Sequence, residues 1–252
     1  MTNTAILILF AVVNVAVTGL FAGVVLSQYL RRHRVYQLYW SIALAMAFVG
    51  TLAYVLMVAV GPTTTGGEVL FRTYYIFGAA LTAAWLGMGS IALISSARIT
   101  RISVAILSVL SILAIVLISI AGIDTHQLAQ VAGTAGKGVL LTGAWLVMII
   151  ILNTLGAVAV VGVAVYSGWK LIRRQSANLY TSKFLWANGL IVVGVLLIAY
   201  AGGGVRVFGL EGSFWLIMAV GWMVLFAGVL LASRRVAAAR SAGQVQASTA
   251  KG

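Results

Sequence analysis

Residues 102–122 have the sequence ISVAILSVLSILAIVLISIAG, without a single charged side chain. A helix of about 20 apolar residues crosses the roughly 30 Å hydrocarbon core of a bilayer, so this stretch is long enough to span one. Comparable apolar stretches lie on both sides of it. They cover residues 4–30, 39–61, 70–96, 139–169, 184–205 and 213–233. The sequence therefore predicts an all-α bundle of seven transmembrane helices.

The composition agrees with this prediction. Hydrophobic residues make up 63% of the 252 and charged residues only 8%, whereas about a quarter of the residues in a soluble domain are charged. We expect residues 1–237 to form one membrane domain, and the small, polar residues 238–252 to form a disordered cytoplasmic tail. The first span is expected to remain in the protein, because it is long for a signal peptide and no basic residue precedes it.

The charged residues are sorted between the two sides of the predicted bundle. A net charge of +13 would indicate a nucleic-acid partner in a soluble protein. Here, however, thirteen of the 16 Lys and Arg residues lie in the connections of one side. The other side holds all the acidic residues and the remaining cations: Glu68, Asp124, Glu211, Arg72, Lys137 and Arg206. The positive-inside rule then predicts a multi-pass plasma-membrane protein with its N-terminus outside and its C-terminus in the cytoplasm, and no nucleic-acid partner.

The basic side is the first candidate site. Its most clustered members are Arg31, Arg32, Arg34, Arg173, Arg174, Arg234 and Arg235. Besides contact with the bilayer itself, we expect such a cytoplasmic face to attract anionic lipid headgroups, at roughly 1 kcal/mol per cation near the surface. It would also suit a separate protein partner.

The chain shows signs of an internal duplication. The first and second spans align with the fifth and sixth after one insertion. The matched pairs are Asn14 with Asn153, Gly23 with Gly162, Arg34 with Arg173, Tyr36 with Tyr180, and Gly50 with Gly194. Two interpretations remain open: a parallel 3+1+3 repeat linked by the span at 102–122, or chance matching between apolar segments.

Groups that carry chemistry are scarce inside the predicted spans. No Asp, Glu, Lys, Arg or His lies in the middle of any span, whereas coupled carriers and proton relays depend on such groups. The chain has no cysteine, and His33 and His126 lie in separate loops. We therefore expect no catalytic residue, no metal site and no cofactor, and we expect the protein not to be an enzyme.

The polar side chains at mid-membrane depth form the second candidate site, namely Asn14, Asn153 and Asn188. In hydrocarbon each of these amides needs a hydrogen-bond partner. They either join neighbouring helices or line a shared central cavity that binds a neutral or amphipathic ligand.

Two further patterns concern the acidic side. Tyr74, Tyr75, Phe214 and Trp215 lie near the predicted outer ends of their spans, as in the aromatic belts that mark membrane interfaces. The three consecutive glycines at 202–204 predict a turn rather than a phosphate-binding loop, because no strand and no Walker lysine accompany them.

One span carries a resemblance to known proteins. Residues 72–79 (RTYYIFGA) and 84–90 (AWLGMGS) resemble a helix of uncharacterised bacterial seven-helix membrane proteins. These proteins are distantly similar to the seven-helix N-terminal sensory regions of some histidine kinases and diguanylate cyclases. The resemblance implies a sensory role. Only a short tail follows Arg235, so we expect signalling to require a separate partner.

The 3+1+3 layout also resembles that of sugar carriers and PQ-loop proteins, although the single proline, Pro62, lies in a predicted loop and offers no helix hinge. Two functions follow from these patterns. The first is a non-enzymatic sensory, binding or accessory membrane protein with an outward-facing cavity. The alternative is a facilitator or channel for a small neutral solute.

Overall fold

The computed structural model describes residues 4–173, 179–204, 208–209 and 211–249. Within these residues the protein is helical without a β-strand, and seven helices are long and apolar enough to cross a membrane. The predicted all-α multi-pass architecture is confirmed. The elements are α1 (Thr4–Arg32), α2 (Val35–Val60), α3 (Thr65–Thr73), η1 (Tyr74–Leu81), α4 (Thr82–Ile94), α5 (Ala97–Ile120), α6 (Thr125–Ala129), α7 (Ala144–Arg173), α8 (Leu179–Ala199), η2 (Tyr200–Gly204), η3 (Glu211–Ser213) and α10 (Phe214–Thr249).

Local capping explains where several helices begin. Helix α3 begins at Thr65 because the Thr64 hydroxyl accepts a hydrogen bond from Gly67 N at 3.0 Å. Helix α5 begins five residues before the predicted span, because Ser96 caps it. Helix α7 begins at Ala144, later than predicted. The residues before it belong to a loop in which Asp124 N donates to Val139 O at 2.8 Å.

The third span is one continuous rod made of α3, η1 and α4, and η1 is a π-helical segment. Wider π turns leave main-chain carbonyls poorly paired. Two side chains donate hydrogen bonds to such carbonyls. Thr82 Oγ1 donates to Phe77 O at 2.6 Å, and Asn153 Nδ2 donates to Ala79 O at 2.8 Å. The segment also lies very close to α2, because a Cβ atom on Gly50 would be 2.6 Å from Gly78 N.

Two stretches differ from the sequence-based expectation. Residues 202–204 do not form a turn, because they continue α8 as the π-helical segment η2. Helix α10 continues to Thr249 through residues where the sequence predicts a disordered tail, and residues 250–252 lie outside the described part. The run from Val236 to Arg240 is rich in alanine, the strongest helix former, and this favours the extension.

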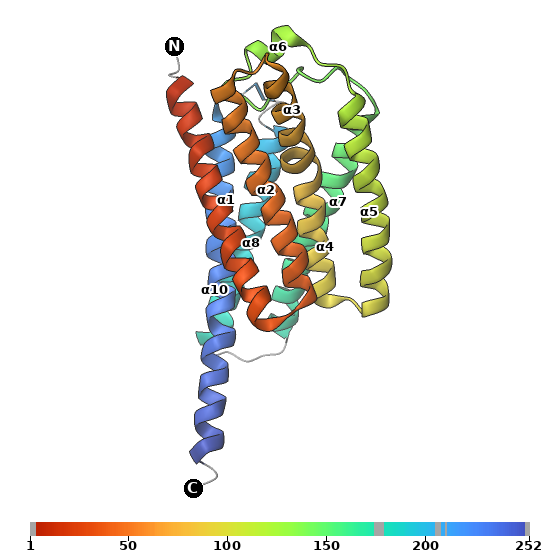
Figure 1. The fold of residues 1–252 in the computed structure, drawn as a ribbon. Coiled ribbons are helices and arrows are strands. Elements are labelled where there is room, and N and C mark those ends of the chain that lie inside the picture. The colour runs from red at the N-terminus through yellow and green to blue at the C-terminus, as the bar shows by residue number, and fades with distance from the viewer. Residues whose placement is uncertain (1–3, 174–178, 205–207, 210, 250–252) are drawn as a thin grey trace.

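Six of the long helices pack as a closed ring in the described part of the chain. Each contacts the next in the order α1, α2, α4, α7, α8, α10 and back to α1. Helix α5 lies outside the ring against α4, η1 and α7, at the edge of the molecule in Figure 1. The small-residue stripe of α4 serves this packing, since a Cβ atom on Gly87 would be 2.8 Å from Gly156 Cα on α7.

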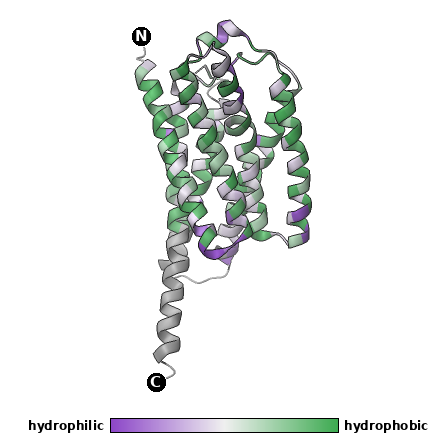
Figure 2. Ribbon diagram, in the orientation of Figure 1, coloured by the Kyte–Doolittle hydropathy of each residue, from purple (hydrophilic) through white to green (hydrophobic). Residues whose placement is uncertain are grey.

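The inside of the ring is filled by apolar side chains in two clusters, one in each half of the membrane span. The cluster of one half includes a side chain from every ring helix: Phe21, Leu44, Leu86, Val160, Val195 and Trp222. Figure 2 shows hydrophobic residues along the helices and hydrophilic residues at the two ends of the bundle. We name these the arginine end, which carries Arg31, Arg32, Arg34, Arg98, Arg101, Lys170 and Arg173, and the cap end, which carries residues 121–143.

Candidate functional site

The arginine end is formed by the α1–α2 turn, the α4–α5 turn and the last turn of α7. Its arginine side chains are exposed except for Arg32, which is half-buried. Arg173 stacks on the Trp169 ring, with its guanidinium carbon 4.3 Å from the ring centroid. Of the other predicted members, Arg174 lies outside the described residues. Arg234 and Arg235 lie on α10, but their side chains are not described.

No side-chain carboxylate accompanies these cations. All three acidic residues of the chain lie on the side of the predicted bundle opposite these cations. Glu68 lies in the first turn of α3, and the Asp124 carboxylate caps α6 by accepting from His126 N and Gln127 N at 2.9 and 3.1 Å. In the part of the chain that the structure describes, the arginine end therefore has no side-chain carboxylate as a counter-ion.

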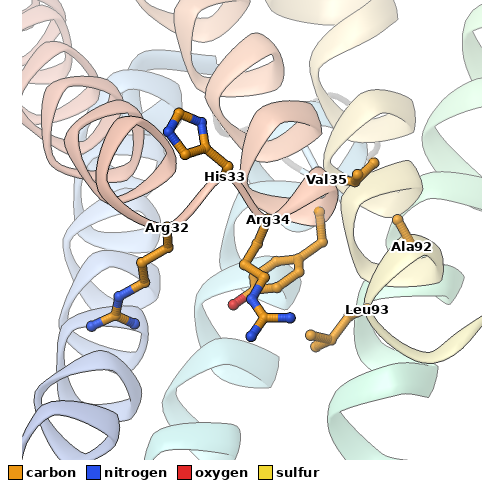
Figure 3. A pocket seen from close by; sticks show the side chains of 7 residues that line it. Arg32, His33, Arg34, Val35, Ala92 and Leu93 are labelled. Carbon is orange, nitrogen blue, oxygen red and sulfur yellow. The ribbon is translucent and has the colours of Figure 1, made fainter.

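A hollow of about 540 Å³ lies at this end, between the α1–α2 turn and the end of α4 (Figure 3). It is lined by Arg32, His33, Arg34, Val35, Tyr36, Ala92 and Leu93. Cations form one part of its wall and apolar side chains the other.

The turn beside the hollow is short and well defined. His33 ends α1 in the left-handed region, with φ 49°, and its N–H donates to Tyr29 O at 2.7 Å. Arg34 then precedes α2, and its side chain makes no capping hydrogen bond to that helix. The first N–H groups of α2 thus have no side-chain cap. The sequence predicts Arg32 and Arg34 as site residues, but it gives no signal that Ala92 and Leu93 lie beside them.

The cap end contains a feature that the sequence does not predict. Residues 121–143 fold over the ends of the helices, and three tyrosine hydroxyls bind their backbone. The Tyr54 hydroxyl, on a side chain with 0% exposure, donates to Val131 O at 3.0 Å and accepts from Gly133 N at 2.8 Å. Tyr74 and Tyr75 donate to Ala135 O and Gly136 O. The loop is thereby held closed over the bundle.

The predicted outer aromatic belt is wrong for these positions. Tyr74, Tyr75, Phe214 and Trp215 are buried within the protein. The Tyr54 and Trp215 ring centroids lie 4.4 Å apart, and Phe214 contacts Trp215 edge-on at 4.8 Å. The cap covers these rings, so they form the core of the cap end. A cap that forms through long-range contacts leaves no local pattern in the sequence.

The three predicted asparagines have different surroundings. Asn14 is fully buried, and its Nδ2 donates to Trp215 O at 3.0 Å and to Phe10 O at 2.8 Å. Asn153 donates to Ala79 O. Asn188 is half-buried on α8. The bonds of Asn14 and Asn153 therefore join α1 to α10 and α7 to η1, and a cavity shared by all three stays a prediction.

Other polar groups do not assemble a reactive centre in the described residues. No three His, Asp or Glu side chains there lie close enough together to hold a metal ion. Within the described residues, Asn14 Oδ1 and Gln37 Oε1 are buried without a hydrogen-bond partner. No protein-family model, no curated protein and no solved structure matches this chain.

Proposed function

We propose that this chain is a non-enzymatic sensory, binding or accessory protein of the plasma membrane, whose arginine end faces the cytoplasm and docks an acidic protein partner or anionic lipid. The observation that carries the proposal is the unequal distribution of charge along the sequence. Thirteen cations belong to one side of the bundle, and every side-chain carboxylate belongs to the other. Repulsion within the cationic end is relieved by anions from outside the chain.

The orientation rests on the same separation. Short connections rich in Lys and Arg are retained on the cytoplasmic side during insertion. The α1–α2 and α4–α5 connections are both short, and Arg31, Arg32, Arg34 and Arg98 lie in them or in the adjoining helix ends. The exposed Trp169 beside Arg173 fits a membrane interface at the same level. The cap end would then face outward.

A binding role fits the chemistry better than catalysis. The Asp124 carboxylate is occupied by capping α6, and Arg72 Nη1 donates to Ile118 O at the end of α5. These charged groups hold the cap end together. The cap above the aromatic core is the part of the protein that would serve as an outward-facing sensory region. Hydrogen bonds hold it to the bundle, and it has no large apolar core of its own.

We also propose the parallel 3+1+3 repeat, because two matched contacts support it. Asn14 of the first span donates to a carbonyl of the seventh, and its match Asn153 of the fifth span donates to a carbonyl of the third. Gly50 of the second span lies against the backbone of the third, and its match Gly194 of the sixth lies against Leu225 of the seventh. The position of α5 outside the ring suits a linker.

The repeat layout favours a second candidate, a facilitator for a small neutral solute. The filling of the ring by apolar side chains in both halves disfavours an open polar path. Solute flux into vesicles that contain the purified protein separates the two functions. Flux above that of empty vesicles supports the facilitator, and its absence supports the docking protein.

The docking proposal is tested by co-purification of the tagged full chain from native membranes. The wild type is compared with Arg98→Gln/Arg101→Gln/Arg173→Gln, which removes three exposed cations, and with the matched triple lysine variant, which keeps their charge. We expect the same acidic partner with the wild type and the lysine variant, and its loss with the glutamine variant. An identical set of co-purified proteins in all three overturns the docking role.

A further inference from the structure

The hollow at the α1–α2 turn differs from the rest of the arginine end, because it is concave and its wall is mixed. Arg32 and Arg34 line it together with Val35 and Leu93, whose side chains are 54% and 45% exposed. Exposed apolar side chains at the end of a membrane span contact lipid. In the proposed membrane arrangement, the hollow would lie at the level where acyl chains meet headgroups.

The charged groups around the hollow suit a phosphate. In Figure 3 the guanidinium groups of Arg32 and Arg34 both extend beyond the helix ends, whereas the His33 ring points the other way. Guanidinium groups bind phosphate oxygens through paired, charge-assisted hydrogen bonds. The N-terminus of α2, which no side chain caps, adds the positive end of a helix dipole at Val35 and Tyr36.

We propose that this hollow is a binding site for the phosphate headgroup of an anionic phospholipid. Arg32 and Arg34 bind the phosphate, the Tyr36 hydroxyl is available as a further donor, and Val35 and Leu93 contact the glycerol and the first acyl carbons. The inference rests on the proposed cytoplasmic docking role of the arginine end. A lipid fits better than a free phosphate, because a soluble anion leaves the apolar wall of the hollow uncovered.

The geometry of the turn assigns a separate role to His33. Its left-handed backbone conformation, at φ 49°, fixes the spacing between the last residue of α1 and the first of α2. Glycine adopts this conformation readily. We therefore expect His33→Gly to keep the turn.

The test measures the affinity of the full chain, in neutral detergent micelles, for phosphatidylglycerol, from the rise in melting temperature with lipid concentration. Two double variants carry the same loss of charge at the same end of the bundle. Arg32→Gln/Arg34→Gln lies in the hollow, and Arg98→Gln/Arg101→Gln lies outside it. We expect the first to weaken phosphatidylglycerol binding at least tenfold more than the second. Equal losses overturn the proposal, because they indicate attraction to diffuse surface charge.

A variant that keeps every cation gives an independent test. Ala92→Trp places bulk in the hollow at the end of α4, where Ala92 is half-buried. We expect it to lower phosphatidylglycerol affinity at least tenfold, while Ala97→Trp, at an exposed position that does not line the hollow, leaves the affinity unchanged. Wild-type affinity in Ala92→Trp overturns the site even if the arginine variants fail to fold.

Soluble glycerol phosphate and neutral phosphatidylcholine separate the possible sources of the ligand. We expect neither to raise the melting temperature at concentrations where phosphatidylglycerol does. Equal stabilisation by glycerol phosphate overturns a lipid ligand in favour of a soluble phosphate. Failure of the lipid site leaves the docking proposal standing, because that proposal is tested with Arg98, Arg101 and Arg173, which do not line the hollow.

Discussion

Asn14 and Asn153 each use a side-chain amide to bind a main-chain carbonyl of another helix. Such bonds contribute about 0.6–2 kcal/mol in membrane proteins. We expect Asn14→Ala and Asn153→Ala to lower the free energy of unfolding by similar amounts in that range. Because the two bonds join different pairs of helices, the losses should add in the double variant to within about 0.5 kcal/mol. Unfolding titrations in mixed micelles measure all three values.

The opposite result has a clear meaning. If both variants keep the wild-type free energy of unfolding but lose binding of a neutral or amphipathic ligand, the amides serve a cavity and not the helix contacts. Strong coupling between the two substitutions would likewise contradict separate bonds.

Tyr54 supports the cap through a single hydroxyl group. In Tyr54→Phe the Gly133 N–H loses its acceptor inside the protein, whereas Val131 O still accepts from Thr134 N at 3.0 Å. An unsatisfied buried group of this kind costs about 1–3 kcal/mol, and we expect a loss of stability of that size. Amide hydrogen exchange should also quicken in residues 131–136.

Tyr39→Phe is the matched control on the same helix, because the Tyr39 hydroxyl makes no hydrogen bond within the part of the chain that the structure describes. We expect it to match the wild type in both measurements. Equal effects of the two substitutions would show that the Tyr54 hydroxyl does not hold the cap.

For single residues, the sequence indicates which side chains are important better than it indicates their hydrogen-bond partners. The asparagines stand out because amides are rare in apolar spans, yet their acceptors are backbone atoms 201 and 74 residues away. Tyr74 and Trp215 occupy positions typical of an interfacial belt. They are buried because the loop at 121–143 folds over them, and hydropathy does not encode that contact.

At the scale of elements, the close crossing of α4 and α7 depends on Gly156. A Cβ atom there would lie 2.7 Å from Ala84 N, too close for the backbones to keep their separation. We expect Gly156→Ala to destabilise the protein by about 1–3 kcal/mol, as overpacking does. Melting temperatures in one detergent measure the effect.

Helix α7 also offers the matched control for this substitution. A Cβ atom on Gly162 would meet no atom within 4 Å. We expect Gly162→Ala to be neutral or to stabilise by up to about 1 kcal/mol, since glycine is costly inside a helix. A Gly156→Ala protein as stable as Gly162→Ala would mean that the crossing adjusts freely.

The elements differ in how far their sequences determine them. Seven long apolar runs predict seven spans, because length and hydropathy are local properties. Caps such as Thr64 and Ser96 move the boundaries by a few residues. The π-helical segment η1 escapes prediction, because Asn153 of another helix pairs with its Ala79 carbonyl. The glycines at 202–204 suggest a turn, yet α8 continues through them.

For the whole molecule, the separation of charge makes the two ends chemically different. The cap end combines Glu68 and Asp124 with few cations and a hydrogen-bonded loop, whereas the arginine end has no side-chain carboxylate. A bilayer with anionic lipids on its inner leaflet stabilises this arrangement in one orientation by about 1 kcal/mol per cation near the surface. The docking proposal and the lipid-site proposal therefore both depend on the orientation of the chain in the membrane.

The chain lacks cysteine, so a single introduced thiol reports on one end without background. Thr63→Cys lies exposed at the cap end, and Ala97→Cys lies exposed at the arginine end. A membrane-impermeant maleimide added to intact cells should label the first, and should label the second only after permeabilisation, because the proposed orientation places the arginine end in the cytoplasm. A denatured sample gives the full labelling of each. Labelling of Ala97→Cys in intact cells would show that the arginine end faces the exterior. An exterior arginine end could dock neither a cytoplasmic partner nor an inner-leaflet lipid, so both proposals would fail.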